Sequence, residues 1–281
     1  MDLPLQPNLS ETLGFTTYPP AYLSSKASGS NLLIGSNFAS AGSGYDPKAA
    51  VINHAIPLYQ QIEYFKEYKI KLTKIAGKNK SESVIQGAIC LLSAGSSDFL
   101  QNYYVNPLLH KVYTPDQYGS YLIENFSSFV KEVYGLGVRK IGVTSLAPLG
   151  CLPLARTLFG FHEKGCVERL NSDAKQFNEK LNSEASKLKK RYSGLKIIVF
   201  DILKPLYDLV QSPSKYGFIE ATKGCCGTGK VETTSLLCNP KSFGACSNAS
   251  EYVFWDSAHP SQAANQVLAD ALITQGIGLI A

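Results

Sequence analysis

The chain has 281 residues, 44% of them hydrophobic and 17% charged, so it can bury one large core and is predicted to form a single domain over residues 1–281. Its 27 basic and 22 acidic residues give a formal net charge of +5. The basic residues are scattered along the chain, whereas nucleic-acid-binding proteins gather them on one face, so no nucleic acid partner is expected. Every apolar stretch breaks at Gly, Ser or Lys within about ten residues, so no membrane span is expected.

Four short apolar segments have the length and composition of β-strands. They cover residues 32–39, 88–94, 140–146 and 195–200. Segments whose apolar residues recur at helical spacing lie between them. This alternation of strands and helices predicts a parallel α/β sheet.

Three helices have clear start or stop signals. One is predicted to begin at Thr114, because the sequence Thr-Pro-Asp-Gln supplies an N-cap hydroxyl, a proline at the first helical position and a capping-box partner. A longer helix has apolar residues on one face between Leu170 and Tyr192, and Gly194 marks its end. The last helix follows Pro260 and is expected to stop at Gly276.

The cysteines and glycosylation sequons favour a secretory route for the intact protein. Cys90 lies in a predicted strand and is expected to be a buried free thiol, while the other cysteines lie in loop sequence typical of disulfides, with the pairing left open. The loop cysteines are Cys151, Cys166, Cys225, Cys226, Cys238 and Cys246, and the sequons start at Asn8, Asn79, Asn125 and Asn248. The first fifteen residues lack the features of a signal peptide, so secretion is predicted for the parent rather than directed by this chain.

Reactive residues in parallel sheets gather just after the carboxyl ends of strands. Near the end of the chain, Asp256 precedes His259 by three residues, and Pro260 keeps His259 out of the helical conformation. A carboxylate bonded to one ring nitrogen fixes the tautomer, so the other nitrogen can accept a proton from a hydroxyl nucleophile. The alternative is that Asp256 only caps the following helix and His259 is an ordinary polar residue.

Two other patterns are weaker. Residues 224–230 have the Gly-x4-Gly-Lys spacing of a phosphate-binding loop, but Val231 replaces the required Ser or Thr and no strand leads into the segment. The late cysteines lack the Cys-x2-Cys spacing of zinc sites. We therefore expect neither a metal nor a cofactor. The remaining histidines, which are assigned surface or core-polar roles, are His54, His110 and His162.

Several separated motifs resemble the SGNH hydrolases, and within them the plant GDSL esterase/lipase branch. Residues 37–44 follow one predicted strand, Gly95-Ser96-Ser97-Asp98 follows another, and Asp256 and His259 come last. Further matches are Tyr18-Pro19-Pro20-Ala21-Tyr22-Leu23, Pro148-Leu149-Gly150-Cys151-Leu152-Pro153, Gly224-Cys225-Cys226-Gly227 and Trp255-Asp256. The resemblance covers essentially the whole chain. It implies a flavodoxin-like three-layer α/β/α fold with a mostly parallel sheet, and a cofactor-free serine ester hydrolase acting on small-molecule acyl or lipid esters.

The resemblance also implies roles for individual residues. In the family, a serine in a Gly-Asp-Ser motif attacks the ester and is activated by the residues that map here to Asp256 and His259. The developing oxyanion would be bound by the backbone amide of Gly42, for which a simple turn is the alternative reading, and by the residue at position 97. That residue is usually Asn and is Ser97 here. A hydroxyl reaches less far than an amide, and losing one such donor costs about 10² to 10³ in turnover.

The nucleophile is unknown. The sequence contains no Gly-Asp-Ser and no Gly-x-Ser-x-Gly, and no context marks the serines of the glycine-rich blocks, Ser40, Ser43, Ser96 and Ser97, as activated. The segment before Glu11 is shorter than the family's first strand and nucleophile turn. We therefore expect an N-terminally truncated member that lacks its first central strand. The alternative function is a catalytically inactive chain that binds ligands only. The oligomeric state is left open.

Overall fold

A three-stranded parallel sheet lies at the centre of the protein. The computed structural model describes residues 18–160, 165–227, 238 and 244–280. Strands β1 (Ile89–Leu92), β2 (Lys140–Thr144) and β3 (Lys196–Phe200) form a parallel sheet, as predicted, and lie side by side in that order. Ile141 pairs in register with Cys90 on one side and Ile197 on the other. A second parallel pair is formed by β4 (Glu220–Gly224) and β5 (Tyr252–Phe254).

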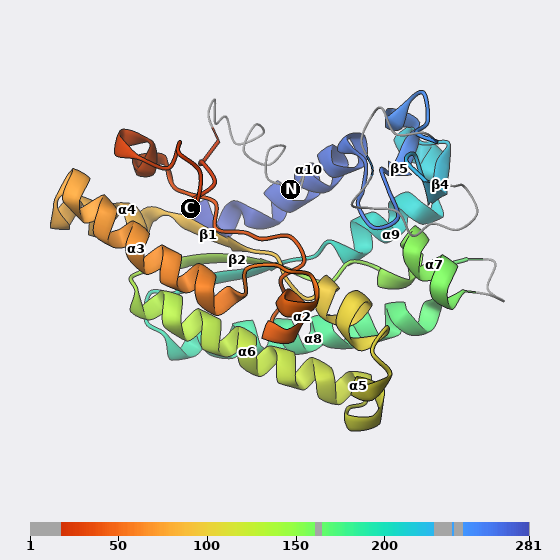
Figure 1. Ribbon diagram of the computed structural model, residues 1–281, viewed down its shortest axis with the longest axis horizontal. Coiled ribbons are helices and arrows are strands. Elements are labelled where there is room, and N and C mark those ends of the chain that lie inside the picture. The colour runs from red at the N-terminus through yellow and green to blue at the C-terminus, as the bar shows by residue number, and fades with distance from the viewer. Residues whose placement is uncertain (1–17, 161–164, 228–237, 239–243, 281) are drawn as a thin grey trace.

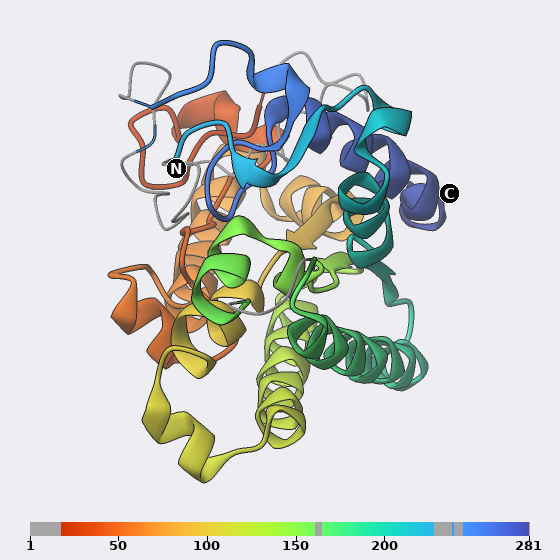
Figure 2. The same cartoon turned by 90° about the vertical axis from the view of Figure 1, so that its right-hand side faces the viewer.

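Helices cover both faces of the central sheet, as Figures 1 and 2 show. On one face lie α6 (Pro115–Gly135) and α8 (Glu168–Arg191), with α3 (Leu58–Ala76) beside α6. On the other face, α10 (Gln262–Ile280) crosses β2 and β3. The result is the predicted three-layer α/β/α arrangement. The shorter elements are α2 (Pro47–Ile52), α4 (Lys78–Gly87), α5 (Pro107–Val112), α7 (Pro153–Phe159), α9 (Leu203–Gln211), the 3-10 helices η1 (Gly29–Ile34), η3 (Leu149–Cys151), η4 (Pro213–Tyr216) and η5 (Ala249–Glu251), and the π-helix η2 (Asp98–Tyr103).

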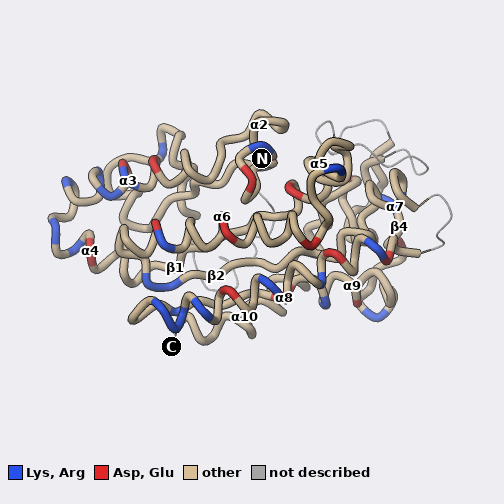
Figure 3. The backbone as a smooth tube through the Cα atoms, turned by 90° about the horizontal axis from the view of Figure 1, so that it is seen from below, with Lys and Arg blue, Asp and Glu red and all other residues tan. Residues whose placement is uncertain are grey.

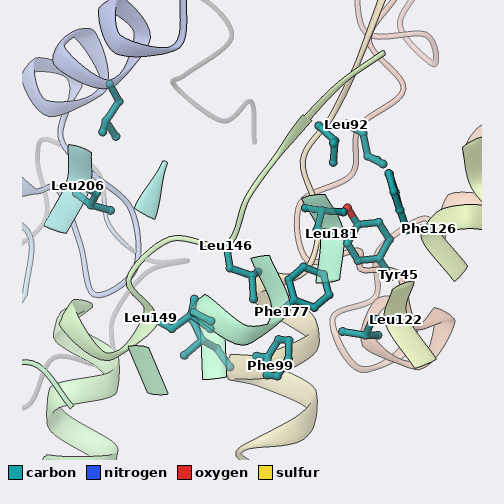
Figure 4. Packing of buried hydrophobic residues seen from close by; sticks show 14 of the residues in the cluster. Tyr45, Leu92, Phe99, Leu122, Phe126, Leu146, Leu149, Phe177, Leu181 and Leu206 are labelled. Carbon is teal, nitrogen blue, oxygen red and sulfur yellow. The ribbon is translucent and has the colours of Figure 1, made fainter. Parts of the chain in front are cut away.

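The core on the α6 and α8 side is built from aromatic contacts. Phe126 and Phe177 are almost fully buried, and the ring of Tyr45 lies within 5.9 Å and 6.2 Å of their ring centroids. Figure 4 shows these rings between the sheet and the helices. Edge-to-face and tilted ring pairs at such separations add stabilisation to simple burial. The loop that contains Tyr45 is therefore fixed to the main core.

The strand predicted at residues 32–39 is wrong. The first residues of this segment complete the 3-10 helix η1, and Gly35 follows with a φ of 108°. Beyond it, Asn37 makes an isolated bridge to Ala21, with a hydrogen bond from its backbone N–H to the oxygen of Pro20. These contacts pair part of the backbone of the segment without the central sheet. Leu32 is buried as part of η1 rather than as a strand residue. The expected loss of a central strand stays a prediction.

The last helix runs past its predicted stop. Gly276 does not end α10, which continues to Ile280. A Cβ at position 276 would lie 3.1 Å from Cε1 of Phe200 on β3, which is tighter than ordinary packing. The glycine therefore lets the helix lie close against the sheet. This close approach, rather than the end of the helix, explains why a glycine occupies position 276.

Six cysteines are paired, as expected for the loop cysteines. The disulfides are Cys151–Cys166, Cys225–Cys246 and Cys226–Cys238, and Cys90 on β1 is free. The predicted free thiol is confirmed, although it is partly rather than fully buried. Within the described ranges, no helix is both long and apolar enough to cross a membrane. Figure 3 shows Lys and Arg on several elements, with a concentration where α3 meets α4, at the end of the molecule away from α7 and β4.

The capping box predicted for α6 is formed. The Thr114 hydroxyl accepts a hydrogen bond from the Gln117 backbone N–H, and the Gln117 side chain accepts one from the Thr114 N–H. We predict that Thr114→Ala lowers the free energy of unfolding by about 1 kcal/mol, the usual cost of losing such a cap. Urea unfolding followed by circular dichroism measures the change. Ser186→Ala is the control, because this exposed α8 hydroxyl donates only to the Asn182 carbonyl, one turn earlier in the helix. Its loss should change the free energy of unfolding by no more than about 0.5 kcal/mol. Equal losses in the two variants would contradict the prediction.

Candidate active site

Asp256 and His259 meet in the turn between β5 and α10. The Nδ1 atom of His259 lies 2.8 Å from Oδ2 and 3.0 Å from Oδ1 of Asp256. The carboxylate is almost fully buried, at 1% exposure, while the imidazole side chain is 32% exposed. Because an ionised carboxylate only accepts hydrogen bonds, Nδ1 carries the hydrogen and Nε2 is the free base. Nε2 forms no hydrogen bond with any residue that the structure describes.

Asp256 also organises the backbone of the turn. Its Oδ1 accepts hydrogen bonds from the N–H groups of Ala258 at 2.8 Å and of His259 at 2.7 Å. Asp256 therefore contacts the His259 ring and also binds two N–H groups of the turn, which lie before the start of α10 at Gln262. Backbone and ring of His259 are bound by the same carboxylate, so little freedom remains in the position of the imidazole.

This contact changes the acidity of the imidazole. The hydrogen bond that His259 Nδ1 donates to Asp256 raises the pKa of His259 above its ordinary value of 6.5, while partial burial of the ring acts in the opposite direction. A negative partner stabilises the imidazolium form, which is the form a general base reaches after accepting a proton. The contact with Asp256 therefore favours the protonated imidazole.

The turn is held by neighbours on two sides. Within it, the Trp255 N–H donates to the His259 carbonyl at 2.8 Å. From α7, the Leu154 N–H donates to the Ser257 carbonyl, also at 2.8 Å. The segment Pro148–Pro153, noted in the sequence without a role, leads into α7 and so contributes to positioning the turn.

A close backbone approach fixes the other side of the turn. Gly224, at the end of β4, lies so near that a Cβ there would come within 2.8 Å of the Asp256 backbone. The next residues are Cys225 and Cys226, each in a disulfide, and the Cys226 N–H donates to the Trp255 carbonyl at 2.7 Å. The Gly-Cys-Cys segment is therefore a support for the Asp256 turn. Of the pattern that resembled a phosphate-binding loop, Lys230 lies outside the described residues.

Gly42 lies in a tight loop with a conformation that requires glycine. Its φ is 85°, and a Cβ would come within 2.6 Å of the Asn53 Cβ. Its carbonyl accepts a hydrogen bond from the Asn53 side chain at 3.0 Å. Its N–H donates to none of the described groups. The geometry suits both readings from sequence, a turn glycine and an amide available to an oxyanion.

Ser97 lies in the turn between β1 and η2. The turn passes through Gly95, whose φ is 110° and where a Cβ would come within 2.7 Å of Leu146. The Ser97 side chain is half-buried, and its hydroxyl bonds to none of the described residues. The next residue, Asp98, accepts hydrogen bonds from the N–H groups of Tyr45 and Asp46. Asp98 thereby ties the loop of Gly42 to the turn of Ser97.

The four predicted site residues thus form two pairs rather than one connected cluster. Asp256 and His259 follow β5 and Ser97 follows β1, whereas Gly42 lies in the loop between η1 and α2. Among the described residues, no hydrogen bond joins the Asp256–His259 pair to Gly42 or Ser97. Two glycine-loop serines are bonded locally: Ser40 accepts from the Ile56 N–H and Ser43 from the side chain of Gln61.

Within the part of the chain that the structure describes, the other histidines and the possible metal ligands form no second centre. His54 is exposed with a φ of 51°, and His110 packs its ring 4.5 Å from that of Tyr103. His162 lies outside the described residues. Within the described ranges, no three His, Cys, Asp or Glu side chains gather as metal ligands would.

Comparison with known proteins identifies related chains over almost the whole length. The model of the GDSL-like lipase/acylhydrolase family matches residues 2–272. GDSL esterase/lipase APG of Arabidopsis thaliana is 77% identical over 271 residues, which are 96% of this chain and 77% of the relative. From the same plant, GDSL esterase/lipase At5g03810 is 55% identical over 272 residues and GDSL esterase/lipase At5g22810 is 55% identical over 274 residues, each covering 96% of this chain and, respectively, 77% and 75% of the relative.

The Asp256–His259 contact predicts a measurable titration. In nitrogen-15 or proton spectra, the His259 ring of the wild type should titrate above 6.5, because Asp256 stabilises its charged form. Asp256→Asn should lower that pKa, since the neutral amide stabilises the imidazolium less. Asp270→Asn makes the same charge change on the exposed side of α10 and should leave the His259 titration where it is. An unchanged pKa in Asp256→Asn would show that the carboxylate does not control the ring.

The close approach at Gly224 predicts a steric effect on the same turn. Gly224→Ala should lower the free energy of unfolding by about 1 to 3 kcal/mol, the usual cost of overpacking, and shift the His259 pKa toward its ordinary value by displacing Asp256. Gly87→Ala is the matched control, because a Cβ there meets no atom within 4 Å. Chemical unfolding and the His259 titration measure the two effects. Wild-type values of both in Gly224→Ala would refute this account of the turn.

Proposed function

Because the chain belongs to the GDSL-like lipase/acylhydrolase family, an ester-hydrolase family, we propose that it hydrolyses acyl or lipid esters with Asp256 and His259 as its acid–base pair. The observation that carries this proposal is the hydrogen bond of 2.8 Å from Nδ1 of His259 to a buried carboxylate. It leaves Nε2 of a half-exposed ring as the base. A histidine so oriented is the acid–base group of serine-type ester hydrolysis.

Each proton has a defined place in this mechanism. Nε2 of His259 accepts the proton of the attacking hydroxyl as its oxygen bonds to the ester carbon. The imidazolium then gives that proton to the departing alcohol, and the ester C–O bond breaks to leave an acyl-enzyme. A water molecule repeats the sequence and releases the acid. Throughout, Asp256 stays ionised and stabilises the imidazolium.

Two groups are proposed to stabilise the tetrahedral oxyanion. The first is the Gly42 backbone N–H, which donates to none of the described residues, and the second is the Ser97 hydroxyl. Because a hydroxyl replaces the family's longer side-chain amide at position 97, we expect the second donor to be the weaker one.

The attacking hydroxyl is left to experiment. Among the described serines, none donates to or accepts from His259 Nε2, and the sequence contains no Gly-Asp-Ser. This observation favours a second candidate function, in which the chain binds acyl ligands without hydrolysing them. The assay below separates the two.

We also propose that the protein acts outside the cell as a glycoprotein. Its three disulfides are of the kind that persist in oxidising compartments. Asn79 and Asn248 are exposed and could carry glycans. Asn125 is a poorer acceptor, because its Nδ2 is buried within α6. Asn8 lies outside the described residues.

Hydrolysis of a short-chain p-nitrophenyl ester tests the proposed function. The purified chain should release p-nitrophenol, and His259→Ala should lower kcat/KM by at least about 10²-fold, the smallest usual contribution of an acid–base group. Because His259 must be neutral to act as a base, activity should rise with pH through its pKa, which lies above 6.5. His110→Ala, which removes an exposed imidazole elsewhere, should retain wild-type activity.

A serine-directed phosphonate followed by peptide mapping identifies the nucleophile in the same samples. Labelling of one serine, abolished in His259→Ala, would name it. Folded protein with neither turnover nor labelling would overturn the hydrolase proposal for this chain and leave the ligand-binding function.

A further inference from the structure

Asp98 is a buried carboxylate that the mechanism above does not use. Its side chain is 0% exposed, and it follows Ser97 directly at the start of η2. A fully buried carboxylate is costly unless its oxygens are well bonded, so its partners indicate what it does. Both oxygens are engaged, and both face the loop of residues 40–46 that contains Gly42.

The contacts of Asp98 reach this loop through its backbone. Oδ2 accepts a hydrogen bond from the Tyr45 N–H at 2.9 Å, and Oδ1 accepts one from the Asp46 N–H at 2.8 Å. Both bonds have the short lengths of charge-assisted hydrogen bonds. Gly44 presses against the same group, since a Cβ there would lie 2.4 Å from the carboxylate oxygens. The loop is thus held by main-chain bonds and by a close approach that only glycine permits.

The loop has no equivalent support on its other side. There, the Asn53 side chain holds the Gly42 carbonyl, and Gln61 reaches the Ser43 hydroxyl at 3.2 Å. Neither bond carries a full charge, and neither connects the loop to β1. The end of the loop is held to η2 by the two backbone bonds to Asp98 and by a side-chain bond of 3.1 Å from Asn102 to Asp46. Of these residues, Asp98 is the one that directly follows Ser97.

We infer that Asp98 is a positioning residue, which fixes the Gly42 amide and the Ser97 hydroxyl relative to each other so that both can meet one oxyanion. This role rests on the proposed ester hydrolysis, but the clamp itself is a property of the fold. Oxyanion donors are effective when they are held in place before the reaction. If they had to reorganise during the reaction, the free energy of that reorganisation would offset the stabilisation of the transition state.

The clamp depends on the charge of Asp98. Burial raises the pKa of Asp98 to about 7. The hydrogen bonds from the two backbone N–H groups act in the opposite direction, because they stabilise the ionised carboxylate. The titratable groups that face it are Asp46 at the start of α2, Tyr45 in the loop and Tyr118 from α6. Burial raises the pKa of both tyrosines, so they stay neutral. Among the described residues, the charge of Asp46 opposes the ionisation of Asp98. Protonation of Asp98 would weaken both bonds to the loop.

Hydrogen exchange of single amides, followed by NMR, tests the clamp directly. In Asp98→Asn, one side-chain oxygen is replaced by an NH₂ group that cannot accept, so the protection factors of the Tyr45 and Asp46 amides should fall by about tenfold or more. Those of α6 and α8 should be retained. Unchanged protection of Tyr45 and Asp46 in the folded variant would overturn the inference.

Gly44→Ala attacks the same contact from the loop side, because its methyl group would collide with the carboxylate. It should lower the same two protection factors. Gly119→Ala is its matched control, since a Cβ there meets its nearest neighbour at an ordinary 3.7 Å.

The wild type decides the matter if Asp98→Asn fails to fold. Protection factors of the Tyr45 and Asp46 amides should fall as the pH drops through about 7. Protection that does not change with pH would overturn the inference. Where the wild type hydrolyses the ester, folded Asp98→Asn should lose kcat with little change in KM. A wild type without activity would refute the proposed function, while the exchange data would still decide the clamp.

Discussion

The candidate site depends on one interaction that occurs twice, a buried aspartate whose carboxylate binds the backbone of a loop. Asp256 accepts the N–H groups of Ala258 and His259, and Asp98 accepts those of Tyr45 and Asp46. In each case a glycine lies where a Cβ would collide, at Gly224 with the Asp256 backbone and at Gly44 with the Asp98 side chain. Loops at a sheet edge are ordinarily mobile, and this combination removes that freedom where side chains must be placed.

Burying a carboxylate has a cost, and the two sites meet it differently. Asp256 has an imidazole that can become positively charged, so ring and carboxylate stabilise each other's charged forms. Asp98 has no cationic partner among the described residues and relies on backbone N–H groups alone, and burial raises its pKa to about 7. The difference fits two functions. A histidine that acts as a base needs a partner that stabilises its positive charge after it accepts a proton. A residue that only positions a loop needs acceptor atoms that hold the backbone in place.

Much of this fold could be predicted from the sequence because its signals are local. The strands at 88–94, 140–146 and 195–200 and the capping box at Thr114 depend on neighbouring residues, and they were found. The errors arose where contacts with other segments, rather than the composition of the segment itself, decide the structure. Segment 32–39 has the composition of a strand but bridges to Ala21 instead of joining the sheet, and Gly276 resembles a helix terminator but makes room for Phe200.

The same distinction applies to the site. Asp256 and His259 are close in sequence, so their spacing allowed the pairing, and the family resemblance favoured it over the capping alternative. Asp98 appeared only as the last residue of a motif, because its partners lie more than fifty residues away and are backbone groups that any residue could supply. No sequence pattern marks such an acceptor. What could have been noticed is a glycine-rich block followed by a second block that ends in aspartate, a combination that suggests one loop resting on the other.

The two halves of the site are therefore supported independently. The Asp256 turn rests on β4, α7 and two disulfides, whereas the Gly42 loop rests on Asp98 and the aromatic core around Tyr45. No hydrogen bond joins the two halves among the described residues. The Asp256 turn leads into α10, which packs on β3 and β2, and Ser97 follows β1, so the strand order β1-β2-β3 sets how far apart the halves lie. A parallel sheet packed on both faces is the rigid support that the proposed base and the proposed oxyanion donors would need to act together.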